Sequence, residues 1–337
     1  MTAPALAVEN LSIGFVERRR ALQAVRELSF SVAPGETLAI VGESGCGKSL
    51  TALALLGLLP DPGRVTGGSI RVQGKELVGL GEKELRRLRG DSIAMIFQEP
   101  MSALNPVLTI GEQIVEAIRA HRPVSRGEAR DRAVALLERV RIPEAGRRFG
   151  EHPHRLSGGM RQRVVIAIAL ACDPAVLVAD EPTTALDVTV QAEILDLIDG
   201  LRRENGAAVL LITHDLGVVA RQADRTLVMY AGRKVEERRT ADLFAGPLHP
   251  YTAGLIAARP GARANSSGRL AEIPGLVPDL DAMPAGCAFA PRCAHAADPC
   301  RTAEPPLLAL GGGAVACLRV EEISRQKPLQ RRLYAHG

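Results

Sequence analysis

Short apolar runs bounded by turn residues predict β-strands near the start of the chain. They span residues 6–13, 27–33 and 68–74, and two of them end in glycine or proline turns. Strands of this length joined by turns usually pair side by side. We therefore expect an antiparallel β-layer in the first part of the chain.

Continuous apolar runs predict a second and more deeply buried layer. ETLAIV (36–41) is typical of a buried strand, and AVLVAD (175–180) and AAVLLIT (207–213) are apolar almost throughout. Such runs are expected for central parallel strands that helices cover on both faces. An apolar helix over 48–59, stopped by a proline, and an amphipathic helix over 189–204 supply such cover. The pattern favours an α/β fold.

The pattern changes after about residue 245. Before it, residues 107–140 are helix-rich with a 3.6-residue period, and 225–237 predicts a hairpin turning at Ala231-Gly232. Beyond it, Pro, Gly and Ala become frequent, the periodicity fades and cysteines appear. We therefore predict one domain over residues 1–245 and a small irregular, cysteine-rich domain over 246–337.

Composition and charge exclude some classes of function. The 337 residues carry a net charge of +4, too little for the strong basic face of a nucleic-acid-binding protein. The N-terminus has no basic leader, and no uncharged apolar run reaches the roughly 18 residues of a membrane span. We expect a soluble, cytosolic chain that does not bind nucleic acid.

GESGCGKS (42–49) fits the pattern G-x-x-x-x-G-K-[ST] between a predicted strand and a predicted helix. Glycines let the backbone curl so that successive amides point at phosphate oxygens, and the helix start adds its positive dipole end. Lys48 supplies a charge for the β- and γ-phosphates, and the Ser49 hydroxyl is expected to ligate Mg²⁺. The other predicted nucleotide contacts of this stretch are Gly42, Ser44, Gly45, Cys46, Gly47 and Leu50.

Two carboxylates end the predicted strand 175–180. A carboxylate pair at the end of a buried strand is costly without a cation nearby. We expect Asp180 to hold Mg²⁺, through water, and Glu181 to polarise an attacking water. Taken alone, the pair could also be a solvated strand end.

LSGGM (156–160) predicts a second phosphate-binding surface. Ser157, Gly158 and Gly159 offer a bare backbone and a hydroxyl at the start of a predicted helix over 160–172. If the two surfaces lie on opposite faces, one chain cannot fold both onto one nucleotide. The expected solution is a head-to-tail pair of subunits.

These motifs resemble, in order, those of the ATP-binding subunits of ABC transporters, over essentially the whole chain. The matches include Gln98 in IFQEP, TTALD (183–187) and His214 in LLITHD. The resemblance implies a P-loop ATPase with a RecA-like parallel core, an antiparallel β-layer and a helical subdomain over about 99–165. It implies catalytic roles for Lys48, Glu181 and His214, the last at the γ-phosphate.

Other residue roles follow only from this resemblance. Gln98 would sense Mg²⁺ and the transmembrane partner, and Asp187 would lie at the interface between two ATPase subunits. Phe15 takes the place of the adenine-stacking aromatic residue, where tyrosine is more usual.

Four stretches resemble one subfamily more closely, the ATPases of dipeptide and oligopeptide importers. They are 96–114, 180–195, HPYTAGL (249–255) and the cysteine-rich tail. The resemblance implies a peripheral subunit on the cytoplasmic face of a bacterial inner membrane. Its partners would be a second ATPase, a paralogue rather than an identical copy, two permease subunits and, indirectly, a solute-binding protein. Importers of nickel and other small solutes share the signature, so the solute stays open.

Other nucleotide-binding classes fit less well. A GTPase would need an N-K-x-D motif, and the chain has no Asn-Lys pair. A DNA-repair ATPase of the same type would insert a long coiled coil or zinc module, whereas residues 50–155 have room only for the ordinary helical region. A translation-factor ATPase would carry two ATPase modules.

Two positions depart from the family pattern. Cys46 stands where many relatives have serine, and Glu99 replaces a more common aspartate. The simpler interpretation of Cys46 is a small tolerated residue. The alternative hypothesis is a reactive thiol whose pKa is lowered by Lys48 and the helix start.

Four cysteines, Cys287, Cys293, Cys300 and Cys317, fall within a proline- and glycine-rich tail. The short C-x2–4-C spacing of zinc sites is absent, and disulfides are not expected in the cytosol. Four thiolates could hold a [4Fe–4S] cluster, which the subfamily resemblance implies, with Pro291-Arg292-Cys293 matching its pattern. Zinc and a metal-free tail remain the alternatives.

Overall fold

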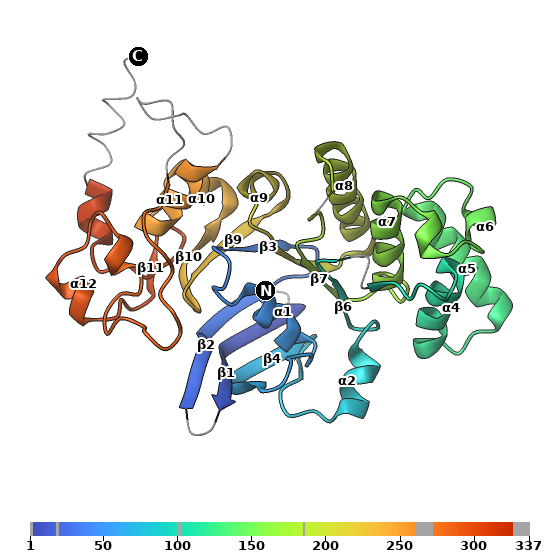
Figure 1. Cartoon of the computed structure of the whole chain (residues 1–337), viewed down its shortest axis with the longest axis horizontal. Helices are drawn as coiled ribbons and strands as arrows, with labels where there is room; N and C mark the ends of the chain where they lie inside the picture. The colour runs from blue at the N-terminus through green and yellow to red at the C-terminus, as the bar shows by residue number, and fades with distance from the viewer. Residues whose placement is uncertain (1–2, 18–19, 100–102, 185, 260–271, 326–337) are drawn as a thin grey trace, which may run out of the picture.

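The computed structural model describes residues 3–17, 20–99, 103–184, 186–259 and 272–325. Its strands form two sheets (Figure 1). The strands are β1 (Leu6–Glu17), β2 (Arg20–Val32), β3 (Thr37–Val41), β4 (Gly63–Val72), β5 (Lys75–Glu76), β6 (Ile93–Ile96), β7 (Val176–Asp180), β8 (Ala208–Ile212), β9 (Arg225–Tyr230), β10 (Arg233–Arg239), β11 (Leu308–Leu310) and β12 (Gly313–Val315). The helices are α1 (Lys48–Leu55), α2 (Glu82–Leu88), α4 (Ile110–His121), α5 (Arg126–Arg139), α6 (Ala145–Arg148), α7 (Gly158–Ala169), α8 (Val188–Asn205), α9 (Leu216–Gln222), α10 (Thr240–Ala245), α11 (Pro250–Ala258) and α12 (Asp298–Thr302).

The larger sheet has the strand order β11-β12-β10-β9-β3-β8-β7-β6. Its five strands from β9 to β6 are parallel neighbours, and β10, β12 and β11 extend it antiparallel. Every residue of β3, β7 and β8 is buried, as continuous apolar runs require. The predicted central parallel strands are confirmed, and their carboxyl ends meet along one edge.

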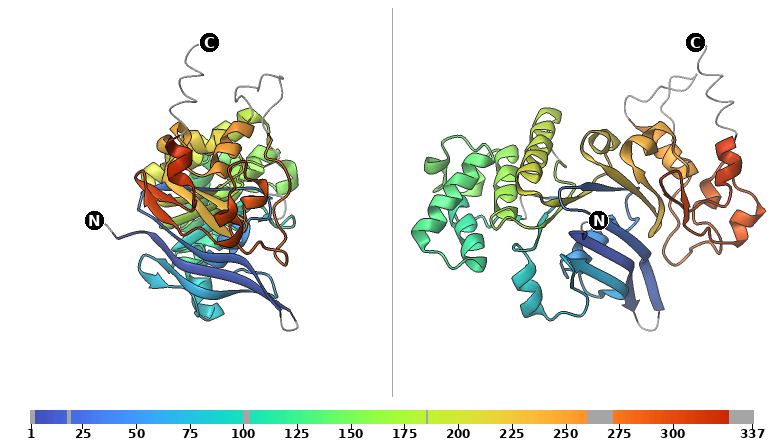
Figure 2. Two further views of the ribbon diagram at one scale, coloured as in Figure 1. Left: turned by 90° about the vertical axis from the view of Figure 1, so that its left-hand side faces the viewer. Right: turned by 180° about the vertical axis from the view of Figure 1, so that it is seen from behind.

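The smaller sheet, of order β2-β1-β4-β5, is antiparallel throughout. It lies below the larger sheet in Figure 1 and again in the end-on view of Figure 2. Residues Leu6, Leu11, Ile13 and Leu28 share one apolar core with α1 and the larger sheet. The predicted β-layer is confirmed, with longer strands, because Glu17 still pairs with Arg20 beside the hairpin turn.

Helices α4 to α7 gather at one end of the long axis, and the C-terminal residues lie at the other (Figures 1 and 2). Thr109 and Ser125 begin α4 and α5 as capping boxes, with the glutamate three residues later closing each box. The apolar faces of these helices form one core with α7, α8 and one face of the larger sheet. The boundaries 99–165, 1–245 and 246–337 stay predictions.

The C-terminal residues share a core with the rest of the molecule. Strand β12 pairs with β10, and Tyr251 and Phe289 pack with Val41 and Tyr230 in one apolar cluster. The segment after 246 therefore packs directly on the sheet that carries the loop 42–49.

One predicted helix is shorter than expected. Helix α1 ends at Leu55, before the predicted end at residue 59, because Gly57 takes a left-handed φ of 62° and closes the last turn. In the described residues, no helix has the length and apolar character needed to cross a membrane.

Candidate nucleotide-binding site

The loop 42–49 links the carboxyl end of β3 to the start of α1. Gly42, Gly45 and Gly47 have φ values of 157°, 79° and 100°, and the last two lie in the left-handed region that favours glycine. A Cβ at Gly42 would collide with the Met229 carbonyl oxygen, and one at Gly47 would lie 2.8 Å from Val25 Cγ2. The loop curls because its glycines adopt these φ values, and the close neighbours at Gly42 and Gly47 leave no space for a side chain there.

Lys48 is the buried cation of this loop. Its side chain is 7% exposed, and Nζ donates to the carbonyl oxygens of Gly42 at 2.7 Å and Glu43 at 3.0 Å. Both acceptors belong to the loop itself, so the ammonium group is held where the loop backbone curls. Its position therefore depends on the conformation of Glu43.

Asp180 lies where β7 meets this loop. It is 4% exposed, and Ser49 Oγ donates to Asp180 Oδ1 at 3.3 Å. Burial raises the pKa of Asp180. The hydrogen bond from Ser49 and the charge of Lys48 offset part of this increase. A buried carboxylate beside a hydroxyl is an oxygen-rich pair of the kind that Mg²⁺ prefers. The two predicted Mg²⁺ ligands from separate motifs are thus brought together.

Glu181 is the centre of a second polar cluster. Its Oε1 lies 3.0 Å from His214 Nδ1, and its Oε2 accepts from Thr184 Oγ1 at 2.9 Å and Gln98 Nε2 at 3.2 Å. Burial raises the pKa of Glu181, but the hydrogen bonds from His214 and Thr184 outweigh burial and leave it below its usual value. Glu181 is therefore a carboxylate, able to accept a proton, at neutral pH.

Gln98, Glu181 and His214 come from the carboxyl ends of three neighbouring strands. The sequence predicted each of these residues but not that they would touch. Thr184 was not singled out, although it lies within the matched TTALD stretch. Glu181 also has a left-handed φ of 46°, an uncommon backbone state for a residue with a Cβ, which turns its side chain toward these partners.

The turn 157–159 begins α7. Ser157 accepts a hydrogen bond from Met160 N at 3.3 Å and caps the helix, and both Ser157 and Gly158 are exposed. A Cβ on Gly159 would lie 2.7 Å from Val190 Cγ1, so this glycine allows close packing on α8. Asp187 caps α8 and is exposed beside this turn.

The other predicted nucleotide contacts lie in the loop, at the start of α1 and, for Phe15, in the smaller sheet. Ser44 and Gly45 are exposed, Leu50 is half-buried, and Phe15 of β1 is half-buried against Gly63. These exposures leave room for a ligand at the loop. Stacking of an adenine on Phe15 stays a prediction.

The hypothesis of a reactive Cys46 is not supported. The side chain is fully buried, and burial raises the pKa of its thiol above the ordinary value, although Lys48 Nζ lies 3.8 Å from Sγ. Desolvation of a thiolate outweighs one neighbouring ammonium that already donates to two carbonyls. A small, inert packing residue fits these observations.

The four tail cysteines lie near one another and are free. Burial raises the pKa of Cys287, Cys293 and Cys317, the last to about 11, and neighbouring cysteines raise each of them further. Nearby backbone amides partly offset this increase in pKa, those of Phe289 and Ala290 at Cys287, that of His295 at Cys293 and that of Arg319 at Cys317.

Cysteine thiols are suitable metal ligands, but the arrangement of these four in the structure does not form a metal site. Within the described ranges, which include all four cysteines, no three Cys, His, Asp or Glu side chains are grouped so that they could hold a metal ion. The predicted iron–sulfur ligand set therefore has no support from this geometry.

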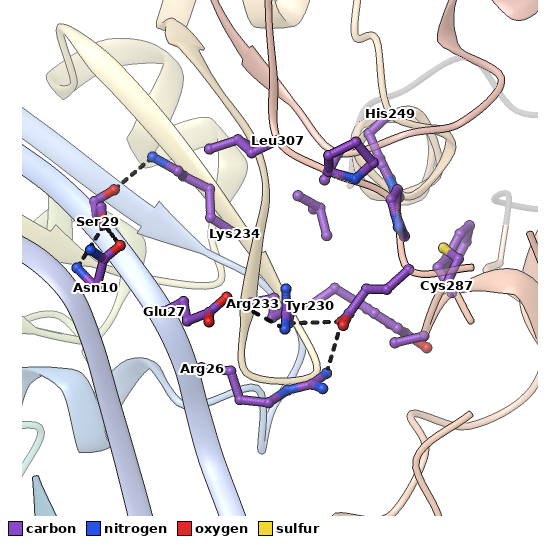
Figure 3. A pocket seen from close by; sticks show the side chains of 17 residues that line it. Asn10, Arg26, Glu27, Ser29, Tyr230, Arg233, Lys234, His249, Cys287 and Leu307 are labelled. Atoms are coloured by element: carbon purple, nitrogen blue, oxygen red, sulfur yellow. Dashed lines mark hydrogen bonds and ion pairs between the residues drawn. The ribbon is translucent and has the colours of Figure 1, made fainter. Parts of the chain in front are cut away.

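A separate cavity of about 320 Å³ lies between the β1–β2 and β9–β10 hairpins and the C-terminal segment. Figure 3 shows Arg26, Arg233 and Glu27 on one side and Cys287 on another. Glu304 pairs with Arg233 at 2.8 Å and with Arg26 at 3.5 Å, so these charges compensate one another. The cavity has none of the residues of the phosphate-binding motif, and we do not assign the nucleotide to it.

Two residues that sequence reasoning missed contact the loop from the C-terminal segment. Tyr251 Oη accepts from the amide of Glu43 at 2.8 Å, and Arg292 forms an ion pair with the Glu43 carboxylate. Tyr251 and Arg292 lie in stretches of sequence that indicated only the resemblance to the peptide-importer subfamily.

Comparisons with known proteins agree with this geometry. A family model described as "ABC transporter" matches residues 25–184, and one described as "Oligopeptide/dipeptide transporter, C-terminal region" matches residues 235–300. A peptide import ATP-binding protein of Brucella abortus (strain 2308) is 52% identical over 316 residues, covering 94% of this chain and 95% of the relative. Another of that description, from Brucella ovis, is 50% identical over 333 residues, covering 95% and 98%.

Solved structures are similar as well. The ATP-binding cassette MJ0796, in a dimeric post-hydrolysis state bound to ADP and Pi, has a TM-score of 0.62 and 30% identity, covering 70% of this chain and 98% of that one. The protein cbiO1 of Clostridium perfringens, part of the ABC transporter complex cbiONQ, has a TM-score of 0.62 and 28% identity, covering 72% and 92%.

Proposed function

Because the chain belongs to the family of ABC transporter ATP-binding proteins, and is an ATPase of that type, we propose that it powers the import of dipeptides and oligopeptides. The loop 42–49, Asp180 and the Glu181 cluster support ATP hydrolysis. The match of residues 235–300 to the oligopeptide and dipeptide transporter C-terminal region carries the choice of solute class. Importers of nickel or another small solute are the second candidate.

Transport assays test this choice. Vesicles or cells that hold the chain with its permeases and solute-binding protein are expected to accumulate labelled dipeptide in an ATP-dependent way. The Glu181→Gln variant should abolish that uptake. Uptake of labelled Ni²⁺ without uptake of any dipeptide would reject the peptide assignment in favour of the second candidate.

Catalysis would combine positioning with charge stabilisation. Lys48 and the loop amides would bind the phosphates, and Glu181 would orient a water and accept its proton. His214, 3.0 Å from Glu181, would contact the γ-phosphate and keep the carboxylate in place. Mg²⁺, when bound by Ser49 and Asp180 with Gln98 nearby, would supply positive charge to the phosphate oxygens.

A second ATPase subunit would complete the site. The exposed turn 157–159 offers the bare backbone of an anion site, and it would face the loop 42–49 of the partner, with Asp187 at the interface. We propose a paralogous partner on the strength of the subfamily resemblance. Light scattering with ATP and Glu181→Gln tests this: a dimer formed by the chain alone would favour an identical copy.

An apolar cavity supports the permease contact. The cavity has a volume of about 340 Å³, and Met95, Phe97, His121 and Ile168 are among the residues that line it. Phe97 directly precedes Gln98 in the sequence. Phe97 is 37% exposed, a large exposed fraction for an aromatic residue. We propose that a permease segment inserts here and holds the chain at the cytoplasmic face of the membrane. The resemblance to ABC transporters also predicts a permease contact over residues 100–106, of which residues 100–102 lie outside the described residues.

Phe97→Glu should reduce the amount of permease that co-purifies with the chain, because it buries a charge in this apolar cavity. The control Phe244→Glu changes a half-buried phenylalanine remote from the cavity. Equal recovery of permease with both variants would reject the cavity as the contact.

A [4Fe–4S] cluster in the tail is a separate proposal. Its support is the ligand type and the subfamily resemblance: the four cysteines of the tail are free, and four thiolates are the ligand set of such a cluster. Iron and acid-labile sulfide, measured after anaerobic purification, should be present and should fall in Cys293→Ser but not in Cys172→Ser. Stoichiometric zinc, or no metal at all, would reject the cluster.

A further inference from the structure

The phosphate-binding loop and the cysteine-bearing tail are joined by one ion pair. Arg292 Nη1 and Nη2 donate to the two carboxylate oxygens of Glu43 at 2.6 and 2.9 Å. A guanidinium that pairs with both oxygens of a carboxylate fixes direction as well as distance. Arg292 directly precedes Cys293, and Glu43 is the second residue of the loop.

Glu43 is held at three points. Its carboxylate accepts from Arg292, its amide donates to Tyr251 Oη at 2.8 Å, and its carbonyl oxygen accepts from Lys48 Nζ at 3.0 Å. Two of these partners come from the C-terminal segment and the third is the phosphate-binding ammonium group. The backbone of Glu43 therefore connects the tail to the position of Lys48.

Arg292 is itself firmly placed. Its side chain is 4% exposed, Nε donates to the Pro274 carbonyl at 2.8 Å, and Nη2 donates to the Ile273 carbonyl at 3.2 Å. The guanidinium also lies 5.8 Å from the centre of the Tyr230 ring. A buried arginine with this many acceptors does not move to follow the loop, so the loop takes its position from Arg292.

We propose that Arg292 is a positioning residue for ATP binding, acting on the loop through Glu43. The pair neutralises a carboxylate that would otherwise face the phosphates of the nucleotide. It also fixes the Glu43 carbonyl that holds Lys48 before the nucleotide arrives. Through this pair, the folding of the cysteine-bearing tail sets the affinity of the loop for ATP.

The test is nucleotide affinity of the full-length chain, measured with a fluorescent ATP analogue. Arg292→Met should weaken binding about tenfold, because it leaves the Glu43 carboxylate unpaired beside the phosphate site. Adding Glu43→Gln to Arg292→Met should restore affinity to within about threefold of the wild type, because it removes that unpaired charge. A purely structural role of Arg292 predicts no such rescue.

Two further variants serve as controls for this interpretation. Arg238→Met is the matched control, since Arg238 ties the C-terminal segment together through the Gly246 and Gly311 carbonyls without touching the loop. It should leave ATP affinity unchanged. Glu43→Gln alone removes the charge of the more exposed partner of the ion pair, and it should weaken binding less than Arg292→Met. This variant also keeps the proposal testable if Arg292→Met does not fold.

The inference rests on ATP binding at the loop 42–49, which the same titration tests separately. Failure of the wild-type chain to bind the analogue would reject that nucleotide site. Wild-type binding with unchanged affinity in both Arg292→Met and Glu43→Gln, or equal loss in Arg238→Met, would overturn the role of Arg292 alone.

Discussion

The loop 42–49 and the turn 157–159 are both bare backbone surfaces at the start of a helix, but their surroundings differ. In the loop, Lys48 is 7% exposed and held by two carbonyls, and Ser49 bonds to Asp180. In the turn, Ser157 is exposed and its hydroxyl caps its own helix. The same local chemistry is completed within the chain in one place and is left exposed in the other.

This difference has a simple physical basis. The loop follows a central strand, where neighbouring strands and the tail bring in carboxylates and carbonyls. The turn begins α7 beside α8, and its residues Ser157 and Gly158 are exposed. Substitutions in the loop and in the turn therefore distinguish residues proposed to act within the chain from residues proposed to act between two subunits.

The largest effect is expected for Glu181→Gln. Turnover should fall about a thousandfold, because the amide cannot accept the proton of water, whereas ATP binding is retained. Phosphate release and nucleotide affinity measure the two steps, and Glu322→Gln, an exposed glutamate in the tail, is the control. Turnover near the wild-type level would rule out Glu181 as the base.

Lys48→Ala should act on binding. ATP affinity is expected to fall about a hundredfold, because a buried cation that meets the phosphates is lost. Lys234→Ala is a matched control, since Lys234 is likewise a largely buried lysine, but it donates to the Ser29 carbonyl and the Glu237 carboxylate, neither of which belongs to the loop. If both variants lost affinity equally, the loss would reflect general destabilisation.

Ser157→Ala should act on the pair of subunits. Turnover is expected to fall about tenfold, the worth of one hydrogen bond to a charged group, while ATP affinity of the isolated chain stays unchanged. The loss of the cap itself should cost about 1 kcal/mol of stability. Ser125→Ala removes a cap of the same geometry from α5. A turnover loss no greater than that of Ser125→Ala would argue against a phosphate contact at this turn.

Cys46→Ser should have the smallest effect. Turnover is expected to change less than about twofold, because the buried thiol packs under the loop and the change is nearly isosteric. Cys172→Ser, another buried cysteine, is the control. Rapid alkylation of the native chain at Cys46, prevented by ATP, would restore the reactive-thiol hypothesis.

Residues within short contiguous motifs could be predicted well. The curl of 42–49 follows from its glycines, and the burial of 175–180 and 207–213 follows from their apolar character. The end of α1 was misjudged because Pro60 hid the earlier stop at Gly57. The sequence left two interpretations of Cys46 open, and burial, which depends on distant strands, favours the simpler one because it outweighs the neighbouring charge of Lys48.

Contacts between distant segments could not be predicted. Glu43 and Arg292 are separated by 249 positions, and neither residue type nor spacing indicates that they pair. The grouping of Gln98, Glu181 and His214 likewise depends on which strands are neighbours. The tail showed its four cysteines in the sequence, but whether they hold a metal depends on geometry.

The sequence by itself determined the buried strands, the phosphate-binding loop and the residue types proposed to bind and hydrolyse a nucleotide, because these depend on local backbone geometry and apolar periodicity. Only the tertiary structure decided that Glu43 joins the loop to Arg292 and that the turn 157–159 stays exposed. The physical reason is that pairing of charges and exclusion of water depend on which surfaces the folded sheets bring together.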